Sequence, residues 1–171
     1  LFMTKAFSRI GAKTTAKLGR ARVARSADIP HLSGVAIRGD ARTHEWAQDR
    51  FSRFIRKKDR ELFVFGFRKP VAYLGILDRE VEDTTVQRIL GDKVNHLAHL
   101  SWIAVDPAYR KVGVARKVVA EATKWAKERG RKGIWLDTSS MRSFWEKMGF
   151  VSVAQEVIHG KERNLMLRKF K

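Results

Sequence analysis

The residues with the clearest chemical potential lie between positions 105 and 117, where an apolar run ends and a basic, glycine-containing turn begins. Asp106-Pro107 predicts a turn, and the apolar spacing after Gly113 predicts a helix. The first turn of a helix presents unpaired N–H groups and a partial positive charge, and a glycine lets the backbone approach an anion closely. Four cationic side chains add to this charge: Arg110, Lys111, Arg116 and Lys117. The segment therefore predicts a phosphate-binding turn, although its spacing matches neither a Walker loop nor a dinucleotide fingerprint.

Taken alone, one glycine in a basic turn favours an ordinary basic helix start that binds nothing. A second segment favours the phosphate-binding interpretation. Arg110-x-x-Gly113-x-Ala115 resembles the pyrophosphate motif of the GCN5-related N-acetyltransferases (GNAT), and the segment 144–150, Phe-Trp-Glu-Lys-Met-Gly-Phe, is similar to a later motif of that family. The resemblance extends over about residues 22–170.

The resemblance implies acetyl-CoA as cofactor and an amine as acceptor. In the family the cofactor lies between the fourth and fifth strands, so backbone groups of Ile103, Ala104 and Val105 would pair with its pantetheine arm. The pyrophosphate would be held beside Arg110 by backbone N–H groups of Lys111, Val112, Gly113, Val114, Ala115 and Arg116.

Direct transfer to an amine needs a group that removes a proton from the acceptor. The resemblance implies a base on the fourth strand, where this sequence has His99, seven residues before Asp106. An imidazole suits this role because its pKa of about 6.5 lies near neutral pH. The alternative is that His99 is a half-buried polar residue of the strand, with His96 equally well placed.

The family places a tyrosine in its later motif as the acid that protonates the leaving thiolate. Here Trp145 occupies that position, and an indole N–H donates a hydrogen bond but no proton. Trp145 is therefore either a cofactor contact that has lost the acid or a core aromatic of a short helix.

These candidate residues need elements to position them. We expect strands at residues 22–25, 62–67, 70–77, 97–105, 134–136, 151–157 and 164–170, and helices at 26–38, 43–57, 113–129 and 139–149. Residues 78–95 are expected to form a loop with at least one helical turn. The order β-α-α-β-β-β-α-β-α-β-β predicts an α/β fold with a mixed (α+β) sheet rather than a doubly wound one, and it matches the GNAT-like acyl-CoA N-acyltransferase fold.

Composition bounds the protein further. The chain has 171 residues, enough for one domain, and no Cys, which excludes disulfides, thiolate metal sites and a cysteine nucleophile; we expect no metal. No apolar run approaches the ~18 residues of a membrane span. We expect a cytoplasmic protein, with the mitochondrion as the alternative because the N-terminal segment has a transit-like composition.

The charge is strongly basic. There are 36 Lys and Arg against 18 Asp and Glu, a formal net charge of +18, and no acid precedes Asp28. We divide the chain into a basic N-terminal arm, 1–20, and a GNAT-like domain, 21–171. Residues 1–25 are a candidate contact for RNA or DNA. The acidic cluster Asp78, Glu80, Glu82 and Asp83 is either a solvated loop or an attractant for a cationic acceptor.

Two functions follow as hypotheses. The first is an N-acetyltransferase that moves acetyl from acetyl-CoA to a protein N-terminus, a lysine or another amine. The alternative is a GNAT-fold protein with weak or no catalysis that serves as a basic component of a ribonucleoprotein or DNA assembly. The sequence leaves the acceptor and the oligomeric state open.

Overall fold

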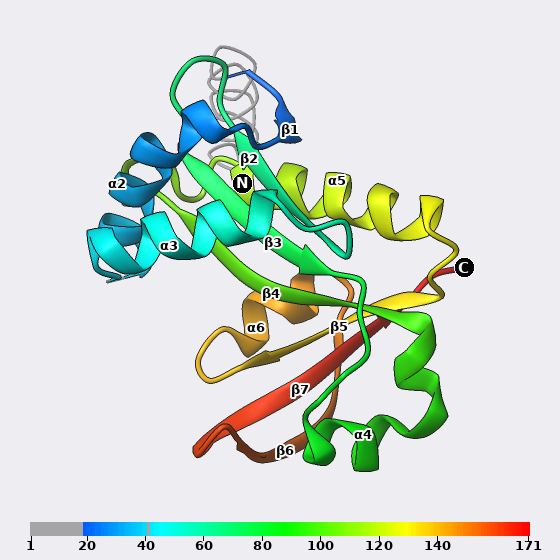
Figure 1. The fold of residues 1–171 in the computed structure, drawn as a ribbon. Coiled ribbons are helices and arrows are strands. Elements are labelled where there is room, and N and C mark those ends of the chain that lie inside the picture. The colour runs from blue at the N-terminus through cyan, green and yellow to red at the C-terminus, as the bar shows by residue number, and fades with distance from the viewer. Residues whose placement is uncertain (1–18, 41) are drawn as a thin grey trace, which may run out of the picture. The chain divides into compact units, whose positions relative to one another are not determined.

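A computed structural model of the chain describes residues 19–40 and 42–171 (Figure 1). Of the predicted basic arm, only Gly19 and Arg20 fall within this range. The prediction of an arm at residues 1–20 therefore lies almost wholly outside the described residues, as does most of the nucleic-acid contact predicted for residues 1–25.

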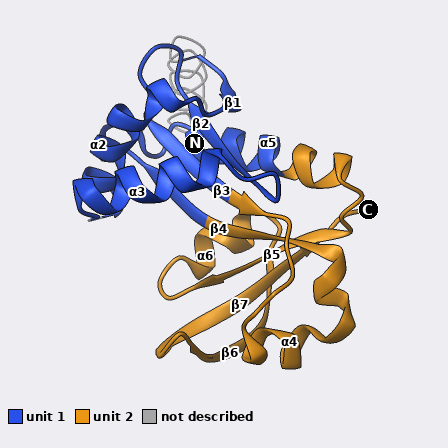
Figure 2. Ribbon diagram, in the orientation of Figure 1, with its two compact units in different colours: residues 1–75, 102–122 blue, residues 76–101, 123–171 orange. Residues whose placement is uncertain are grey.

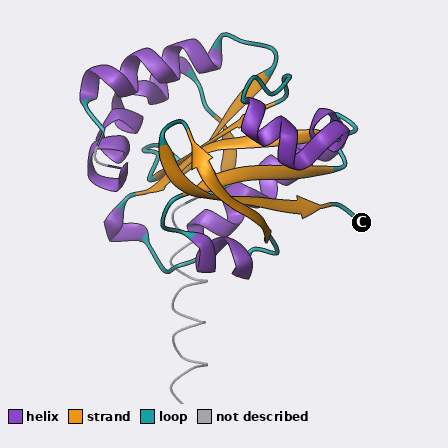
Figure 3. Cartoon of the chain, turned by 90° about the horizontal axis from the view of Figure 1, so that it is seen from below, coloured by secondary structure: helices purple, strands orange, loops and turns teal. Residues whose placement is uncertain are grey.

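The described chain forms seven strands and a set of α- and 3-10 helices joined by loops (Figure 3). In chain order they are β1 (Ala21–Val23), η1 (Ser26–Asp28), α2 (Ile29–Asp40), α3 (His44–Ile55), β2 (Arg60–Phe65), β3 (Ala72–Leu77), α4 (Thr84–Leu90), η2 (Gly91–His96), β4 (Leu97–Val105), η3 (Pro107–Tyr109), α5 (Val114–Glu128), β5 (Gly133–Thr138), α6 (Arg142–Lys147), β6 (Val151–Ile158) and β7 (Lys161–Lys169).

The strands form one mixed sheet in the order β1-β2-β3-β4-β5-β7-β6. β4 and β5 run parallel, whereas β5 and β6 each pair with β7 in antiparallel fashion. This arrangement confirms the α/β class with a mixed sheet and the expected element order. The main addition is at residues 78–95, where the expected helical turn is a full helix, α4, followed by η2.

The chain divides into two compact units (Figure 2). The first contains the described residues up to Gly75 together with Trp102–Ala122, and the second contains Ile76–Ser101 and Thr123–Lys171. β3, β4 and α5 contribute residues to both units. The phosphate-turn residues belong to the first unit, and His99 and Trp145 belong to the second.

The core of the first unit is aromatic. Phe51 of α3 meets Tyr73 of β3 edge-on at 4.9 Å between ring centroids, and Phe54 lies 4.6 Å from Trp102 of β4. Gly75 makes room for this packing, because a Cβ there would lie 3.0 Å from the Trp102 ring. Thr43 caps α3 by accepting a hydrogen bond from the backbone N–H of Trp46. The aromatic residues of 43–57 are thus helix core, as their spacing predicts.

The core of the second unit lies between α4, η2 and strands β4 to β7. Asp83 starts α4 by accepting hydrogen bonds from the backbone N–H groups of Thr85 and Val86. The helix then packs apolar side chains on the sheet; the buried cluster is Val81, Val86, Leu90, Val94, Leu97, Trp135, Ile158 and Leu165. β6 and β7 join through His159 and Gly160, both with positive φ, as a two-residue hairpin turn requires.

Candidate active site

The predicted phosphate turn lies in the first unit, between the end of β4 and the start of α5. Its backbone is left-handed at two positions, Lys111 with φ of 64° and Gly113 with φ of 87°. A Cβ added at Gly113 would meet nothing within 4 Å, so the space beside it is open. An exposed glycine with open space, directly before a 15-residue helix, is suited to bring backbone N–H groups up to an anion.

Asp106 anchors the start of this turn. Its buried carboxylate accepts hydrogen bonds from Nε and an Nη of Arg38 on α2, at 2.8 and 2.6 Å, and from the backbone N–H of Ala108 at 3.1 Å. Its own backbone N–H donates to the carbonyl of Val71 at 2.8 Å. The end of β4 is therefore tied to α2 and to the start of β3, which holds the turn in place.

Arg110 has a more specific position than its charge alone predicts. Its Nε donates to the carbonyl of Val105 at 3.1 Å, and one of its Nη atoms donates to the carbonyl of Gly39 at 3.0 Å. The guanidinium thus closes the turn by bonding backbone oxygens, and it leaves positive charge at the strand end. Three more cationic side chains of the turn and first helical turn are exposed: Lys111, Arg116 and Lys117.

The other residues predicted around the cofactor differ in burial. Ala104 and Val114 pack into the core, whereas Ile103, Val105, Val112 and Ala115 are half-buried. For all of them the sequence predicts backbone contacts, which do not require an exposed side chain.

His99 lies in the second unit at the centre of a polar cluster. It is the register partner of Trp135 on the parallel strand β5. The two rings stack, with centroids 3.8 Å apart and planes within 6° of each other. Asp137 follows two residues later on the same face of β5, and its Oδ1 lies 3.8 Å from Nε2 of His99.

Arg163 of β7 completes the cluster. Leu165 is the register partner of Asp137, and Arg163 lies two residues before it, on the same face of the sheet. Nη1 of Arg163 donates to Oδ2 of Asp137 at 2.5 Å. The His99 side chain is 23% exposed and that of Asp137 only 12% exposed, so solvent screens this contact weakly.

Burial and charge set the protonation of the cluster. Burial lowers the pKa of His99, and this effect exceeds the opposing influence of Asp137. Burial also raises the pKa of Asp137, but the contacts with His99 and Arg163 outweigh it, so the pKa of this carboxyl lies below its usual range. At neutral pH the cluster is a neutral imidazole beside an ionised carboxylate. Since Nε2 faces the carboxylate, the proton is favoured on Nε2 and the lone pair on Nδ1 is the basic site.

The structure separates the two histidines that the sequence leaves as equal candidates. His96 lies in η2 and is exposed, and its carbonyl accepts a hydrogen bond from the backbone N–H of Lys132. His99 alone stacks on Trp135 and faces Asp137. The two histidines therefore differ in their surroundings, and the role of His99 as a proton acceptor stays a prediction.

Trp145 packs as a core residue of the second unit. It is 3% exposed and meets the rings of Phe144 and Phe150 edge-on, at 4.9 and 5.2 Å. These contacts explain why a large aromatic occupies the position. A contact between Trp145 and the cofactor stays a prediction.

The acidic cluster of residues 78–83 is partly structural. Asp78, with a 9% exposed side chain, forms ion pairs with Arg129 and Arg131, and Asp83 caps α4. Asp78 is therefore not a solvated carboxylate, whereas Glu80 and Glu82 are exposed, as a solvated loop predicts. Attraction of a cationic acceptor stays a prediction. The sequence did not predict Asp137 and Arg163 as neighbours of His99, since the register of β4 with β5 and of β5 with β7 brings them together.

Two absences apply to residues 19–40 and 42–171. No group of three or more His, Asp or Glu side chains there is arranged to hold a metal ion. Within the same residues, no helix combines the length and the apolarity that crossing a membrane requires.

Comparison with known proteins assigns the fold to a family. A family model described as the acetyltransferase (GNAT) family matches residues 32–150. The comparison with curated proteins gave no match. Among solved structures, an acetyltransferase from Thermus thermophilus is 15% identical with a TM-score of 0.68, and the match covers 90% of this chain and 99% of that one.

Two further structures are similar. The ribosomal-protein-S18-alanine N-acetyltransferase of Escherichia coli is 19% identical with a TM-score of 0.66, and the match covers 87% of this chain and 92% of that one. An N-acetyltransferase from Thermoplasma acidophilum in complex with coenzyme A is 16% identical with a TM-score of 0.61, covering 88% and 98% of the two chains. At these identities the structures show a shared fold.

Proposed function

Because the chain belongs to the GNAT acetyltransferase family, we propose that it transfers an acetyl group from acetyl-CoA to the nitrogen of an amine acceptor. Two observations, each within one unit, support this proposal: the open, left-handed turn that follows β4 in the first unit, and the neutral imidazole of His99 on β4 in the second. Similar structures include an N-acetyltransferase holding coenzyme A, which supports the choice of cofactor.

The phosphate turn would hold the pyrophosphate of acetyl-CoA. Backbone N–H groups from Lys111 to Arg116 are the proposed donors, and the first turn of α5 adds the positive end of the helix dipole. Arg110 keeps the turn closed through Val105 and Gly39, and the exposed Lys111, Arg116 and Lys117 attract the phosphates. Backbone groups of Ile103, Ala104 and Val105 are proposed to pair with the pantetheine arm.

His99 would accept the proton of the acceptor ammonium at Nδ1, directly or through one water. The free amine attacks the thioester carbonyl, the nitrogen–carbon bond forms, and the tetrahedral oxyanion collapses with cleavage of the carbon–sulfur bond. The electron pair leaves on sulfur as the thiolate of coenzyme A. The new nitrogen–carbon bond leaves a surplus proton on the nitrogen. Since Trp145 carries no transferable proton, we propose that water takes this proton from the nitrogen and passes one to the thiolate.

Asp137 and Arg163 would act on the acceptor chemistry through His99. The carboxylate favours the Nε2–H tautomer, and Arg163 holds the carboxylate by a 2.5 Å hydrogen bond. Trp135 fixes the plane of the imidazole by stacking. These three are positioning residues in this scheme, and His99 is the residue that meets the acceptor.

The test is thiol release from acetyl-CoA with panels of N-terminal peptides, lysine peptides, polyamines and small amines. We expect release above the rate of spontaneous hydrolysis with at least one panel, and a rise in melting temperature on adding acetyl-CoA. A melting temperature unmoved by saturating acetyl-CoA, together with no release on any panel, would reject the proposal. It would favour the alternative of a non-catalytic GNAT-fold component.

A further inference from the structure

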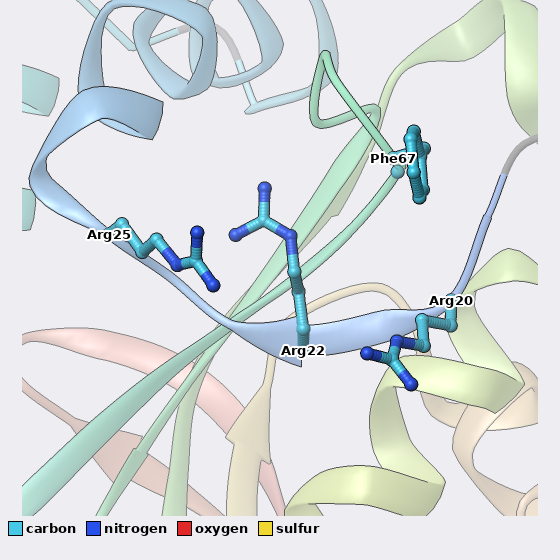
Figure 4. A pocket seen from close by; sticks show the side chains of 5 residues that line it. Arg20, Arg22, Arg25 and Phe67 are labelled. Atoms are coloured by element: carbon cyan, nitrogen blue, oxygen red, sulfur yellow. The ribbon is translucent and has the colours of Figure 1, made fainter.

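A second basic surface lies in the first unit, apart from the residues assigned to the phosphate turn. Arg20, Arg22 and Arg25 line a depression together with Gly66 and Phe67. Figure 4 shows Arg20 directly before β1, Arg22 on it, Arg25 just beyond it, and Phe67 on the turn that follows β2. The net charge of +18 far exceeds what one pyrophosphate needs, and nothing in the acetyl-transfer scheme uses this surface.

The depression is built by the pairing of β1 with β2. Arg22 is the register partner of Val64, and the backbone N–H of Gly66 donates to the carbonyl of Arg20 at 3.5 Å. The chain then turns tightly, so that Val71 donates back to the carbonyl of Phe65 at 2.8 Å. Gly66 has φ of 136°, and a Cβ there would clash with the carbonyl oxygen of Lys69. The turn is therefore fixed by its backbone.

This turn holds an aromatic ring in solvent. Phe67 is 76% exposed, the highest exposure among the large hydrophobic side chains of the described residues. A single exposed phenyl ring is common on protein surfaces. What makes this one a candidate contact is its place on a rigid turn beside a depression lined by arginines. Arg68 and Lys69, on the same turn, are exposed cations beside it.

The three arginines differ in whether an acidic side chain neutralises their charge. Arg22 is held by Asp28 through two hydrogen bonds of 2.7 Å, and Asp28 is buried. Asp28 is thereby fully engaged, since it also accepts from the backbone N–H of Arg25 at 2.8 Å. Within residues 19–40 and 42–171, no acidic side chain forms an ion pair with Arg20 or with Arg25. Two guanidinium groups thus remain to meet an external anion.

We propose that this surface binds single-stranded nucleic acid, with backbone phosphates on Arg20 and Arg25 and an unpaired base stacked on Phe67. Guanidinium groups suit phosphate oxygens, and an exposed aromatic ring stacks on any base. Duplex nucleic acid keeps its bases stacked inside and offers none to Phe67. A lipid surface is flat and is bound by several inserted apolar groups, whereas here one ring stands beside a concave cluster of cations.

The test uses the full chain and fluorescein-labelled single-stranded RNA of about 12 nucleotides, followed by fluorescence anisotropy at several salt concentrations. We expect salt-dependent binding. Arg20→Ala combined with Arg25→Ala should lower the slope of log affinity against log salt by about 1.4, because each phosphate contact on a single strand contributes about 0.7. Lys161→Ala is the charge control, because Lys161 is an exposed cation at the start of β7 in the second unit; it should change the slope by less than half that amount.

Stacking is tested separately. Phe67→Ala should weaken RNA binding about tenfold and leave binding of inorganic polyphosphate, which has no bases, unchanged; Phe67→Tyr should restore RNA binding. Melting temperatures of all variants show whether they fold. The proposal is overturned if Phe67→Ala and the double arginine variant bind RNA as the wild type does. It is overturned equally if the chain binds anionic phosphatidylserine vesicles through Phe67 but not RNA. Acetyl transfer should be intact in every variant, so this outcome is independent of the catalytic proposal.

Discussion

The imidazole of His99 lies parallel to the indole of Trp135, 3.8 Å away between ring centroids, because the two residues are register partners on the parallel strands β4 and β5. This stack holds one edge of the imidazole toward Asp137, which is itself held by Arg163. The arrangement keeps His99 neutral and oriented, which is what a general base requires.

The first prediction concerns His99 itself. His99→Gln keeps a planar polar side chain but removes the basic nitrogen, so kcat for the best acceptor should fall about 100-fold, as is typical when a general base is lost. The dissociation constant of acetyl-CoA, measured by calorimetry, should be unchanged. A variant that keeps more than half of the wild-type rate would remove His99 from the mechanism.

The second prediction is a pH profile. Burial lowers the pKa of His99, so the acidic limb of kcat/KM should lie below the ordinary histidine value of about 6.5. Asp137 raises the pKa of His99 against this burial effect. Asp137→Asn should therefore move the limb to still lower pH.

Glu128→Gln is the control for that shift. Glu128 is another carboxylate of the second unit, on α5, and it forms an ion pair with Lys124. The acidic limb of its kcat/KM profile should lie at the same pH as that of the wild type. An unchanged limb in Asp137→Asn would show that Asp137 does not act through His99, whether or not acetyl transfer itself persists.

The third prediction concerns the phosphate turn. Gly113→Ala places a Cβ on a left-handed residue, which costs about 1–2 kcal/mol of conformational energy. Because the added methyl group also enters the space proposed for the pyrophosphate, affinity for acetyl-CoA should fall at least tenfold in calorimetric titration.

Gly130→Ala provides the matched comparison. Gly130 also has positive φ, 72°, and open space around its missing Cβ, but it follows the C-terminal end of α5, in the second unit. Its variant should lose similar stability and keep its affinity for acetyl-CoA. Equal losses of affinity in both variants would mean that Gly113 matters for folding alone.

The fourth prediction concerns Asp28 and stability. Burial raises the pKa of Asp28, but hydrogen bonds from Arg22 and from the backbone of Arg25 outweigh it, so the folded-state pKa lies below the usual value. The resulting stability is present above the unfolded-state pKa, about 3.9, and is lost as pH falls through the folded-state pKa. Asp28→Asn should lower the free energy of unfolding by about 2 kcal/mol at neutral pH.

Urea unfolding at neutral pH and at pH 3 measures this effect. The difference in free energy of unfolding between the wild type and Asp28→Asn should be smaller at pH 3, since the wild-type carboxyl is then becoming protonated. A gap that stays constant with pH would show that the Arg22 contact contributes no charge-dependent stability.

The fifth prediction concerns Trp145. Trp145→Ala should destabilise the chain by about 3–5 kcal/mol, because it leaves a large cavity beside Phe144 and Phe150. Trp145→Tyr should keep much of this packing and supply a hydroxyl. Thermal unfolding separates the two variants, and a Trp145→Ala protein as stable as the wild type would contradict the assignment of Trp145 to the core.

Local patterns in the sequence predicted the elements well. The helix at 43–57 and its buried Phe51 and Phe54 follow from spacing alone, and the turn before α5 follows from one short segment around Gly113. That this turn binds phosphate stays a prediction. The resemblance to a family added His99 as a candidate. The helix and the turn are each specified by a few consecutive residues, so local patterns are enough to predict them.

Contacts between residues that lie far apart in the chain could not be predicted from the sequence. Arg163 is 26 residues from Asp137, and Arg110 is 71 residues from the Gly39 carbonyl that it bonds. Asp78 likewise bonds Arg129, which is 51 residues away, so the acidic residues beside Asp78 in the sequence did not indicate this partner. Such contacts depend on strand register and on tertiary packing, which no local pattern specifies.

The most direct measurement is transfer of a radiolabelled acetyl group from acetyl-CoA to the acceptor panels, with wild type and His99→Gln in parallel. The label should reach the nitrogen of at least one class of amine with the wild-type chain, at a rate about 100-fold above that of the variant. Binding of acetyl-CoA without transfer of label to any amine, or equal transfer by both proteins, would contradict the account.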